Sequence, residues 1–135
     1  MELHNYIESI IHSIIFVFLI SAIKEPYRRQ LMVVMLAYAG GVYLNNDFQL
    51  YAGWFGIIMC TFSFLGFKSY KFIGVGWIIH TIYDWIHYKN GFPLINGVPG
   101  TAFGCAVFDI GIAIYFLFDA PNLFSKTKSL LVKTK

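Results

Sequence analysis

Three ionisable side chains lie at helical spacing inside one of the apolar stretches of this chain. His80, Asp84 and His87 occupy positions i, i+4 and i+7 within residues 77–87. At about 100° per residue, these side chains fall within roughly 60° of one another on a helix. Imidazole and carboxylate groups together suit zinc or iron, and a pair at i, i+4 can chelate one ion. The spacing therefore predicts a metal site on one helix face, with these three residues as ligands.

Further polar residues occur in the first and last apolar stretches. Glu8 and His12 share a helix face at i, i+4, and Asp109 interrupts the last stretch. His12 is the alternative to His87 as the third metal ligand. A catalytic zinc lowers the pKa of its bound water to about 7, and Glu8 or Asp109 would act as the general base. Asp109 is alternatively a ligand, or a partner that orients a histidine ring.

Two other interpretations of these residues stay open. An aspartate beside a histidine in an apolar interior forms a hydrogen-bonded pair that fixes helix packing without any ion. A row of ionisable groups inside a membrane also marks paths for protons or solutes. A haem held by His12 and His80 would leave the carboxylates unexplained, and membrane desaturases carry many more histidines than the four of this chain.

The composition indicates the medium that surrounds these residues. The 135 residues are 58% hydrophobic and only 13% charged, whereas a soluble domain carries about 25% charged residues. A chain this short has too little interior to bury so many apolar side chains. We therefore expect an all-α, polytopic transmembrane helix bundle, multi-pass in the cell membrane, as a single domain over residues 1–120. Cys60 and Cys105 lie in apolar runs and are expected to be small buried residues without a disulfide.

Five apolar stretches are candidate spans, which need about 17–25 residues, and the second is rather short for one. Pro26 separates the first stretch from the second, and a four-span alternative merges the second and third into one broken hairpin. The turn-rich segment 89–100 precedes the last stretch, and residues 121–135 form a basic tail. The expected spans are residues 6–23, 30–45, 48–67, 72–88 and 101–118.

Charge orients the predicted bundle. With five spans, Lys89 alone among the ten lysines and arginines falls on one side. The positive-inside rule therefore places the N-terminus outside and the C-terminus in the cytoplasm. Counted along each helix, all the candidate site residues then belong to the outer half of the bundle, and the inner half is expected to be almost entirely apolar. The basic residues are spread between apolar runs, so no nucleic-acid partner is expected.

Small residues predict where the helices approach closely. Gly100 and Gly104 are four residues apart, and Gly111 continues the same strip one heptad later. Such strips allow close helix packing in lipid. The strip could face the bundle interior or a second copy of the chain, which leaves a homo-oligomer open.

Most of the chain resembles a family of small bacterial integral membrane proteins of unknown function. The resemblance is carried by Gly-Val-Gly-Trp-Ile-Ile-His80-Thr-Ile-Tyr-Asp84-Trp-Ile-His87, then Gly91-Phe-Pro93, then Phe103-Gly-Cys105-Ala-Val-Phe-Asp109. It implies a shared core of these residues and no activity. The chemistry is also similar to that of the alkaline ceramidase and adiponectin-receptor superfamily of zinc hydrolases. Those proteins have seven spans and a Ser/His/Asp arrangement that this chain lacks, so no residue is carried over from them.

The leading hypothesis is a metal-dependent membrane enzyme, with zinc or iron, that hydrolyses a lipid or a small amphiphile. The first alternative is a small transporter or a proton-linked channel subunit. The second is a structural membrane component whose polar network only locks the helices together.

Overall fold

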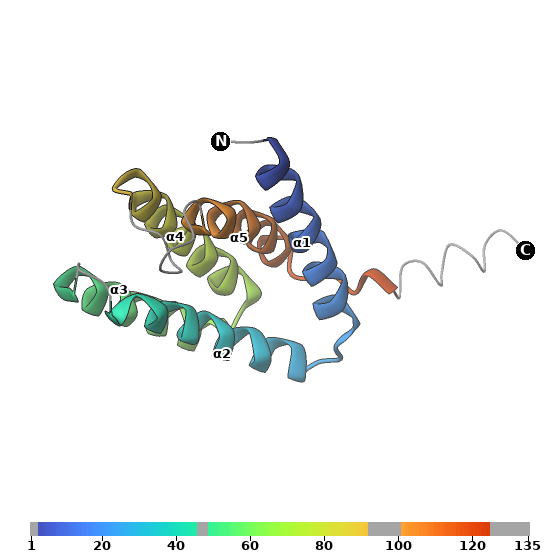
Figure 1. The fold of residues 1–135 in the computed structure, drawn as a ribbon. Helices are drawn as coiled ribbons and strands as arrows, with labels where there is room; N and C mark the ends of the chain where they lie inside the picture. The colour runs from blue at the N-terminus through green and yellow to red at the C-terminus, as the bar shows by residue number, and fades with distance from the viewer. Residues whose placement is uncertain (1–2, 46–48, 92–100, 125–135) are drawn as a thin grey trace, which may run out of the picture.

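The computed structural model describes residues 3–45, 49–91 and 101–124 (Figure 1). These residues form five α-helices and one short 3-10 helix, and no strand occurs among them. The all-α prediction is confirmed, and the second and third apolar stretches form two separate helices. The predictions for residues 92–100, which include Gly100 of the glycine strip, and for most of the basic tail lie outside the described residues. The elements are α1 (Leu3–Ala22), α2 (Tyr27–Gly41), η1 (Val42–Asn45), α3 (Gln49–Gly66), α4 (Tyr70–Lys89) and α5 (Thr101–Leu117).

The helix boundaries follow local sequence signals. Pro26 immediately precedes α2, as the predicted break required. Ser69 caps α4, because its hydroxyl oxygen accepts a hydrogen bond from the backbone N–H of Lys71 at 3.3 Å. Gly91 follows α4 with a φ of 75°, a left-handed conformation that favours glycine. The second predicted stretch divides at Gly41, where α2 tightens into η1.

The helices form two antiparallel pairs with α1 at one side (Figure 1). α2 lies beside α3, α4 lies beside α5, and α3 packs on α4. α1 packs on α5, where the Gly104 and Gly111 positions face Ser9 and Ser13 of α1. This part of the predicted glycine strip therefore serves packing within one chain.

The bundle has a continuous apolar core and an apolar outer surface. Among the core side chains, Leu36, Met59, Ile73 and Phe116 are fully buried. Large hydrophobic side chains also point outward from every α-helix, among them Leu19, Val34, Trp54, Ile82 and Ile114. Within the described ranges, no helix combines the length and the mean hydropathy required to cross a membrane. The predicted five spans stay a prediction.

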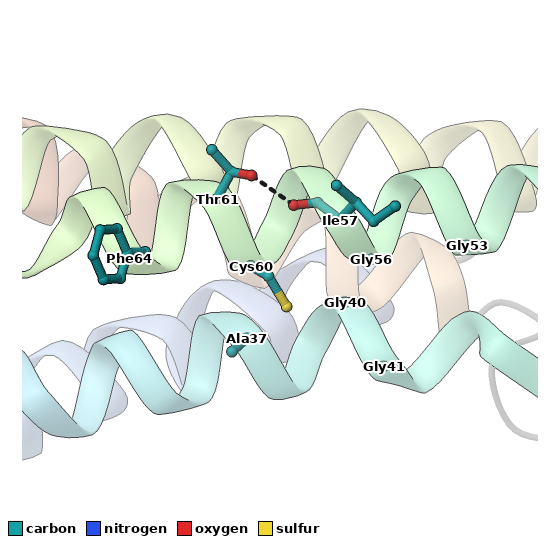
Figure 2. A pocket seen from close by; sticks show the side chains of 9 residues that line it. All are labelled: Ala37, Gly40, Gly41, Gly53, Gly56, Ile57, Cys60, Thr61 and Phe64. Carbon is teal, nitrogen blue, oxygen red and sulfur yellow. Dashed lines mark hydrogen bonds between the residues drawn. The ribbon is translucent and has the colours of Figure 1, made fainter.

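A groove of about 600 Å³ runs between α2 and α3 (Figure 2). A Cβ atom on Gly40 would lie only 2.7 Å from the Cβ atom of Met59, so this glycine permits the close approach of the two helices. Cys60 lines the groove and is exposed, in contrast to its predicted burial, whereas Cys105 is half-buried. Both cysteines are free, as predicted. No histidine, carboxylate or amine is among the described residues that line this groove.

A buried polar cluster lies where α1, α2, α4 and α5 meet at the basic end of the bundle. The Arg28 guanidinium is 2.9 Å from a Glu25 carboxylate oxygen and donates hydrogen bonds to the hydroxyls of Tyr70 at 3.1 Å and Tyr115 at 3.3 Å. It also donates to the Ser21 carbonyl oxygen at 3.4 Å. The expectation of an almost entirely apolar inner half is therefore wrong, because Arg28 turns inward instead of pointing away from the bundle.

Candidate metal centre

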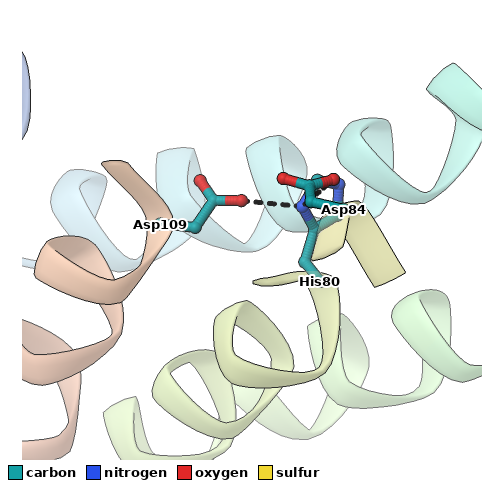
Figure 3. Close-up of side chains that lie close together, drawn as sticks. All are labelled: His80, Asp84 and Asp109. Carbon is teal, nitrogen blue, oxygen red and sulfur yellow. Dashed lines mark hydrogen bonds and ion pairs between the residues drawn. The ribbon is translucent and has the colours of Figure 1, made fainter. Parts of the chain in front are cut away.

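The candidate centre joins α4 and α5 in the interior of the bundle (Figure 3). His80 and Asp84 lie one turn apart on α4, and Asp109 faces them from α5. His80 Nδ1 is 2.7 Å from Asp109 Oδ2 and 3.5 Å from Asp84 Oδ1. The three residues expose 7%, 0% and 3% of their surface, respectively. One imidazole nitrogen thus faces two carboxylates in an apolar interior.

The ligand atoms of this cluster are close enough to share one cation. One atom from each of His80, Asp84 and Asp109 can be chosen so that all lie within 4.8 Å of one another. Asp84 Oδ2 is buried and has no hydrogen-bond partner among the described residues. An unpartnered buried carboxylate oxygen is costly, and such an atom points to a bound ion, water or proton at that position. One nitrogen and two carboxylate oxygens are a donor set that suits zinc or iron.

The second ring nitrogen of His80 has a partner of its own. His80 Nε2 lies 3.4 Å from the carbonyl oxygen of Ala39, near the end of α2. With Nε2–H donating to this carbonyl, Nδ1 is left facing the two carboxylates. Metal-binding histidines are commonly oriented in this way, with the second nitrogen on a carbonyl or a carboxylate. The end of α2 therefore fixes which nitrogen of His80 faces the centre.

Tyr43 belongs to this centre and was missed by the sequence analysis. It lies in η1, is fully buried, and donates a hydrogen bond from its hydroxyl to Asp84 Oδ1. Its sequence signal is a tyrosine near the end of an apolar stretch, which also describes Tyr38. Tyr38 is 76% exposed. Tyr43 follows the buried residues Ala39 and Gly40 of α2 by four and three positions and so continues their helix face, whereas Tyr38 lies off that face.

His87 is buried but does not join the ligand group. It lies about one turn beyond Asp84, and its ring centroid is 4.6 Å from that of Tyr43 and 4.8 Å from that of Tyr83. The described residues therefore place His87 in an aromatic layer above the centre. The third residue of the ligand group is Asp109 of α5, and not His87 as the spacing along α4 predicts.

Glu8 and His12 are exposed on α1, and neither belongs to the ligand group. The reason is the orientation of α1, which packs on α5 through Ser9 and Ser13. Glu8 and His12 precede these serines by one residue, so about 100° of helix rotation turns them away from that contact. Glu8 and His12 share one helix face, but that face is directed outward.

A pocket of about 200 Å³ adjoins the aromatic layer between α3 and α4. Tyr51, Tyr83, Ile86 and His87 line it. Tyr83 and His87 in turn contact the ring of Tyr43. Contacts therefore lead from the pocket wall to Asp84 through the ring and hydroxyl of Tyr43.

Comparison with known proteins gives a family and no activity. Residues 4–122 match a family model described as a family of unknown function (DUF6010). The match agrees with the predicted membership of an uncharacterised family, and it does not bear on the chemical similarity to ceramidases. No curated protein and no solved structure matches the chain.

Proposed function

We propose that this chain, which belongs to the DUF6010 family of unknown function, is a metal-dependent hydrolase of a lipid or a small amphiphile. Its metal ligands are His80, Asp84 and Asp109. The observation that carries the proposal is the buried group of three ligand residues, whose ligand atoms lie within 4.8 Å of one another and which includes an unpartnered carboxylate oxygen. Three protein ligands with one open position are typical of catalytic zinc sites.

Metal binding requires only a small rearrangement of these residues. Two ligands on a tetrahedral zinc are roughly 3.4 Å apart, as follows from bond lengths near 2.0–2.1 Å. His80 Nδ1 and Asp109 Oδ2 are 2.7 Å apart and share a hydrogen bond. The ion would replace the shared proton and separate the two atoms by less than about 1 Å. We therefore expect metal affinity to rise with pH.

Each residue of the centre has a chemical task in this proposal. A bound zinc or iron ion supplies a nucleophilic water at neutral pH. Asp109 has a second carboxylate oxygen that can accept the proton of that water. The Ala39 carbonyl keeps His80 Nδ1 directed at the centre. The pocket lined by Tyr83 and His87 would hold the apolar part of a substrate.

The apolar outer surface of the bundle supports the proposal that the protein lies in the membrane. Apolar side chains such as Leu19, Val34, Trp54 and Ile114 are exposed, whereas His80, Asp84 and Asp109 are buried. Mean hydropathy averages over all faces of a helix, while lipid contacts only the outward face. We propose a multi-pass protein with the N-terminus outside, so that the metal centre lies in the outer half of the bundle.

Metal analysis tests the proposal. The protein is purified in detergent without chelators and without a histidine tag, beside the His80→Ala/Asp84→Ala variant and the His12→Ala variant. We expect about one zinc or iron ion per chain in the native protein and in His12→Ala, and none in the double variant. A native protein without bound metal, after growth with zinc and iron, would overturn the proposal.

Hydrolysis is then measured on fluorogenic acyl esters and amides in detergent micelles. Product release should depend on the metal, stop after chelation and return when zinc or iron is added. Asp109→Asn should lower the rate, and His12→Ala should not. If metal-loaded protein hydrolyses neither class of substrate, the metal site stands and the proposed hydrolase activity is overturned.

A further inference from the structure

We infer that Tyr43 is a positioning residue that makes Asp84 a one-oxygen metal ligand and thereby selects small cations such as zinc. The inference rests on the proposed metal centre and extends it to a residue outside the ligand group. Tyr43 holds Asp84 Oδ1 by a hydrogen bond, while Oδ2 of the same carboxylate has no partner among the described residues. The two oxygens of Asp84 therefore have different surroundings.

The Tyr43 ring has little freedom to move. The side chain is 0% exposed. Its ring centroid lies 4.6 Å from that of His87, 4.8 Å from that of Tyr83 and 5.7 Å from that of Phe55. Packing on three sides fixes the ring, and a fixed ring fixes the direction of the hydroxyl. The hydrogen bond to Asp84 thus belongs to a rigid part of the interior.

The chain reaches this arrangement through the buried face of α2, which carries Ala39 and Gly40 and which Tyr43 continues. α2 ends at Gly41, and η1 carries Tyr43 into the core between α3 and α4. Ala39, four residues earlier, supplies the carbonyl oxygen that faces His80 Nε2. The same turn of chain therefore orients both a histidine and a carboxylate of the proposed centre.

The consequence concerns the kind of metal that fits. A carboxylate with two free oxygens can bind a large cation such as calcium through both, at 2.3–2.6 Å. A carboxylate whose Oδ1 already accepts a hydrogen bond offers chiefly Oδ2, which suits zinc at about 2.0–2.2 Å. Outer partners of this kind typically change metal affinity by about 10–100-fold. Tyr43 is therefore expected to govern both affinity and selectivity.

Tyr83 provides a matched control. Its ring contacts Tyr43 at 4.8 Å and stacks on Phe55 at 3.9 Å, in the same aromatic layer. Its hydroxyl oxygen is buried and has no hydrogen-bond partner among the described residues. Tyr83→Phe and Tyr43→Phe each remove one buried hydroxyl, but only the second frees an oxygen of Asp84.

The test is metal titration of purified full-length protein with zinc, cobalt(II) and calcium. We expect Tyr43→Phe to weaken zinc and cobalt binding by about 10–100-fold. The variant should also show a smaller preference for zinc over calcium and a changed visible spectrum of bound cobalt. Tyr83→Phe should stay within about twofold of the native protein. A purely structural hydroxyl would alter thermal stability and leave the cobalt spectrum and the selectivity unchanged.

The outcomes separate this inference from the proposed function. If the native protein binds no metal, the proposed function fails and this inference fails with it. If the native protein binds zinc and Tyr43→Phe binds it equally well with the same cobalt spectrum, only the role of Tyr43 is overturned. If Tyr43→Phe does not fold, infrared spectra of the zinc-loaded native protein test the inference instead. Widely separated carboxylate stretches mean one-oxygen binding and support the inference, and closely spaced stretches overturn it.

Discussion

His80 and Asp109 meet across the interface of α4 and α5, with the imidazole Nδ1 2.7 Å from the carboxylate Oδ2. The two residues are 29 positions apart in the chain. Both are nearly fully buried, at 7% and 3% exposure. Because breaking a buried pair leaves one polar partner without compensation, this contact constrains how the two helices pack.

Removing only Asp109 should cost more stability than removing the whole buried cluster. In metal-free protein, we expect Asp109→Ala to lower the free energy of unfolding by about 3–5 kcal/mol. The triple variant His80→Leu/Asp84→Leu/Asp109→Leu should recover most of that loss, because Asp84, which also faces His80 Nδ1, is then not left as a buried charge without its partner. Thermal unfolding in detergent measures both. A triple variant that is less stable than Asp109→Ala would show that the cluster itself stabilises the fold.

A close approach of α4 to α5 depends on Gly74. A Cβ atom there would lie 2.9 Å from the backbone nitrogen of Leu117, which cannot move aside as a flexible side chain can. We expect Gly74→Ala to destabilise the protein by about 1–3 kcal/mol. Gly53→Ala is the control, because nothing lies within 4 Å of its added Cβ; it should be neutral or stabilising by up to about 1 kcal/mol. Equal melting temperatures for the two variants would refute this account.

Arg28 connects three segments at the basic end of the bundle and should not tolerate lysine. A lysine ammonium lacks the planar fork that reaches Glu25, Tyr70 and Tyr115 together. We expect Arg28→Lys to cost about 1–3 kcal/mol, the usual penalty for buried groups left without partners. Arg29→Lys should cost less, because Arg29 is half-buried and its partners are the carbonyl oxygens of Phe67 and Lys68 and the ring of Tyr70, which a lysine ammonium can also contact. Equal losses for the two variants would contradict the connecting role.

Glu25 should make stability fall at acidic pH. Partial burial opposes its ionisation, but hydrogen bonds from Tyr70 and Arg28 outweigh that effect and lower the pKa of Glu25 below its ordinary value of 4.5. A lowered folded-state pKa contributes stability that is present above the unfolded pKa and is lost as pH falls through the folded pKa. Because the side chain is 44% exposed, the effect should not exceed about 1 kcal/mol.

The measurement is melting temperature against pH, for the native protein and for Glu25→Gln. The melting temperature of the native protein should exceed that of Glu25→Gln at neutral pH, and this difference should shrink as pH falls below 4.5. A constant difference between the two proteins from pH 6 to pH 3 would mean that Glu25 contributes no such stability.

The proposed orientation can be checked with single cysteines. In a background with Cys60→Ala and Cys105→Ala, Lys89→Cys at the end of α4 should react with a membrane-impermeant maleimide on intact cells. Lys24→Cys, which is exposed between α1 and α2, should react only after the cells are permeabilised. Labelling of both positions in intact cells would rule out this membrane topology.

The sequence by itself determined the local structure. Apolar stretches broken by Pro26 and by the turn-rich segment 89–100 predicted the helices within a few residues of their observed bounds, because helix formation and helix ends depend on nearby residues. The spacing of His80 and Asp84 likewise placed both on one face of α4, since one turn of helix fixes that relationship. Asp109 was selected because a carboxylate in an apolar run is costly.

Only the tertiary structure decided which faces meet. Glu8 and His12 have the same four-residue spacing as His80 and Asp84, yet α1 turns its serines to α5 and leaves both residues exposed. Arg28 lies two residues after the predicted helix break at Pro26, yet its side chain is buried and contacts Glu25, Tyr70 and Tyr115. The rotation of a helix about its axis is set by contacts with neighbours distant in the chain, and periodicity within one helix does not contain that information.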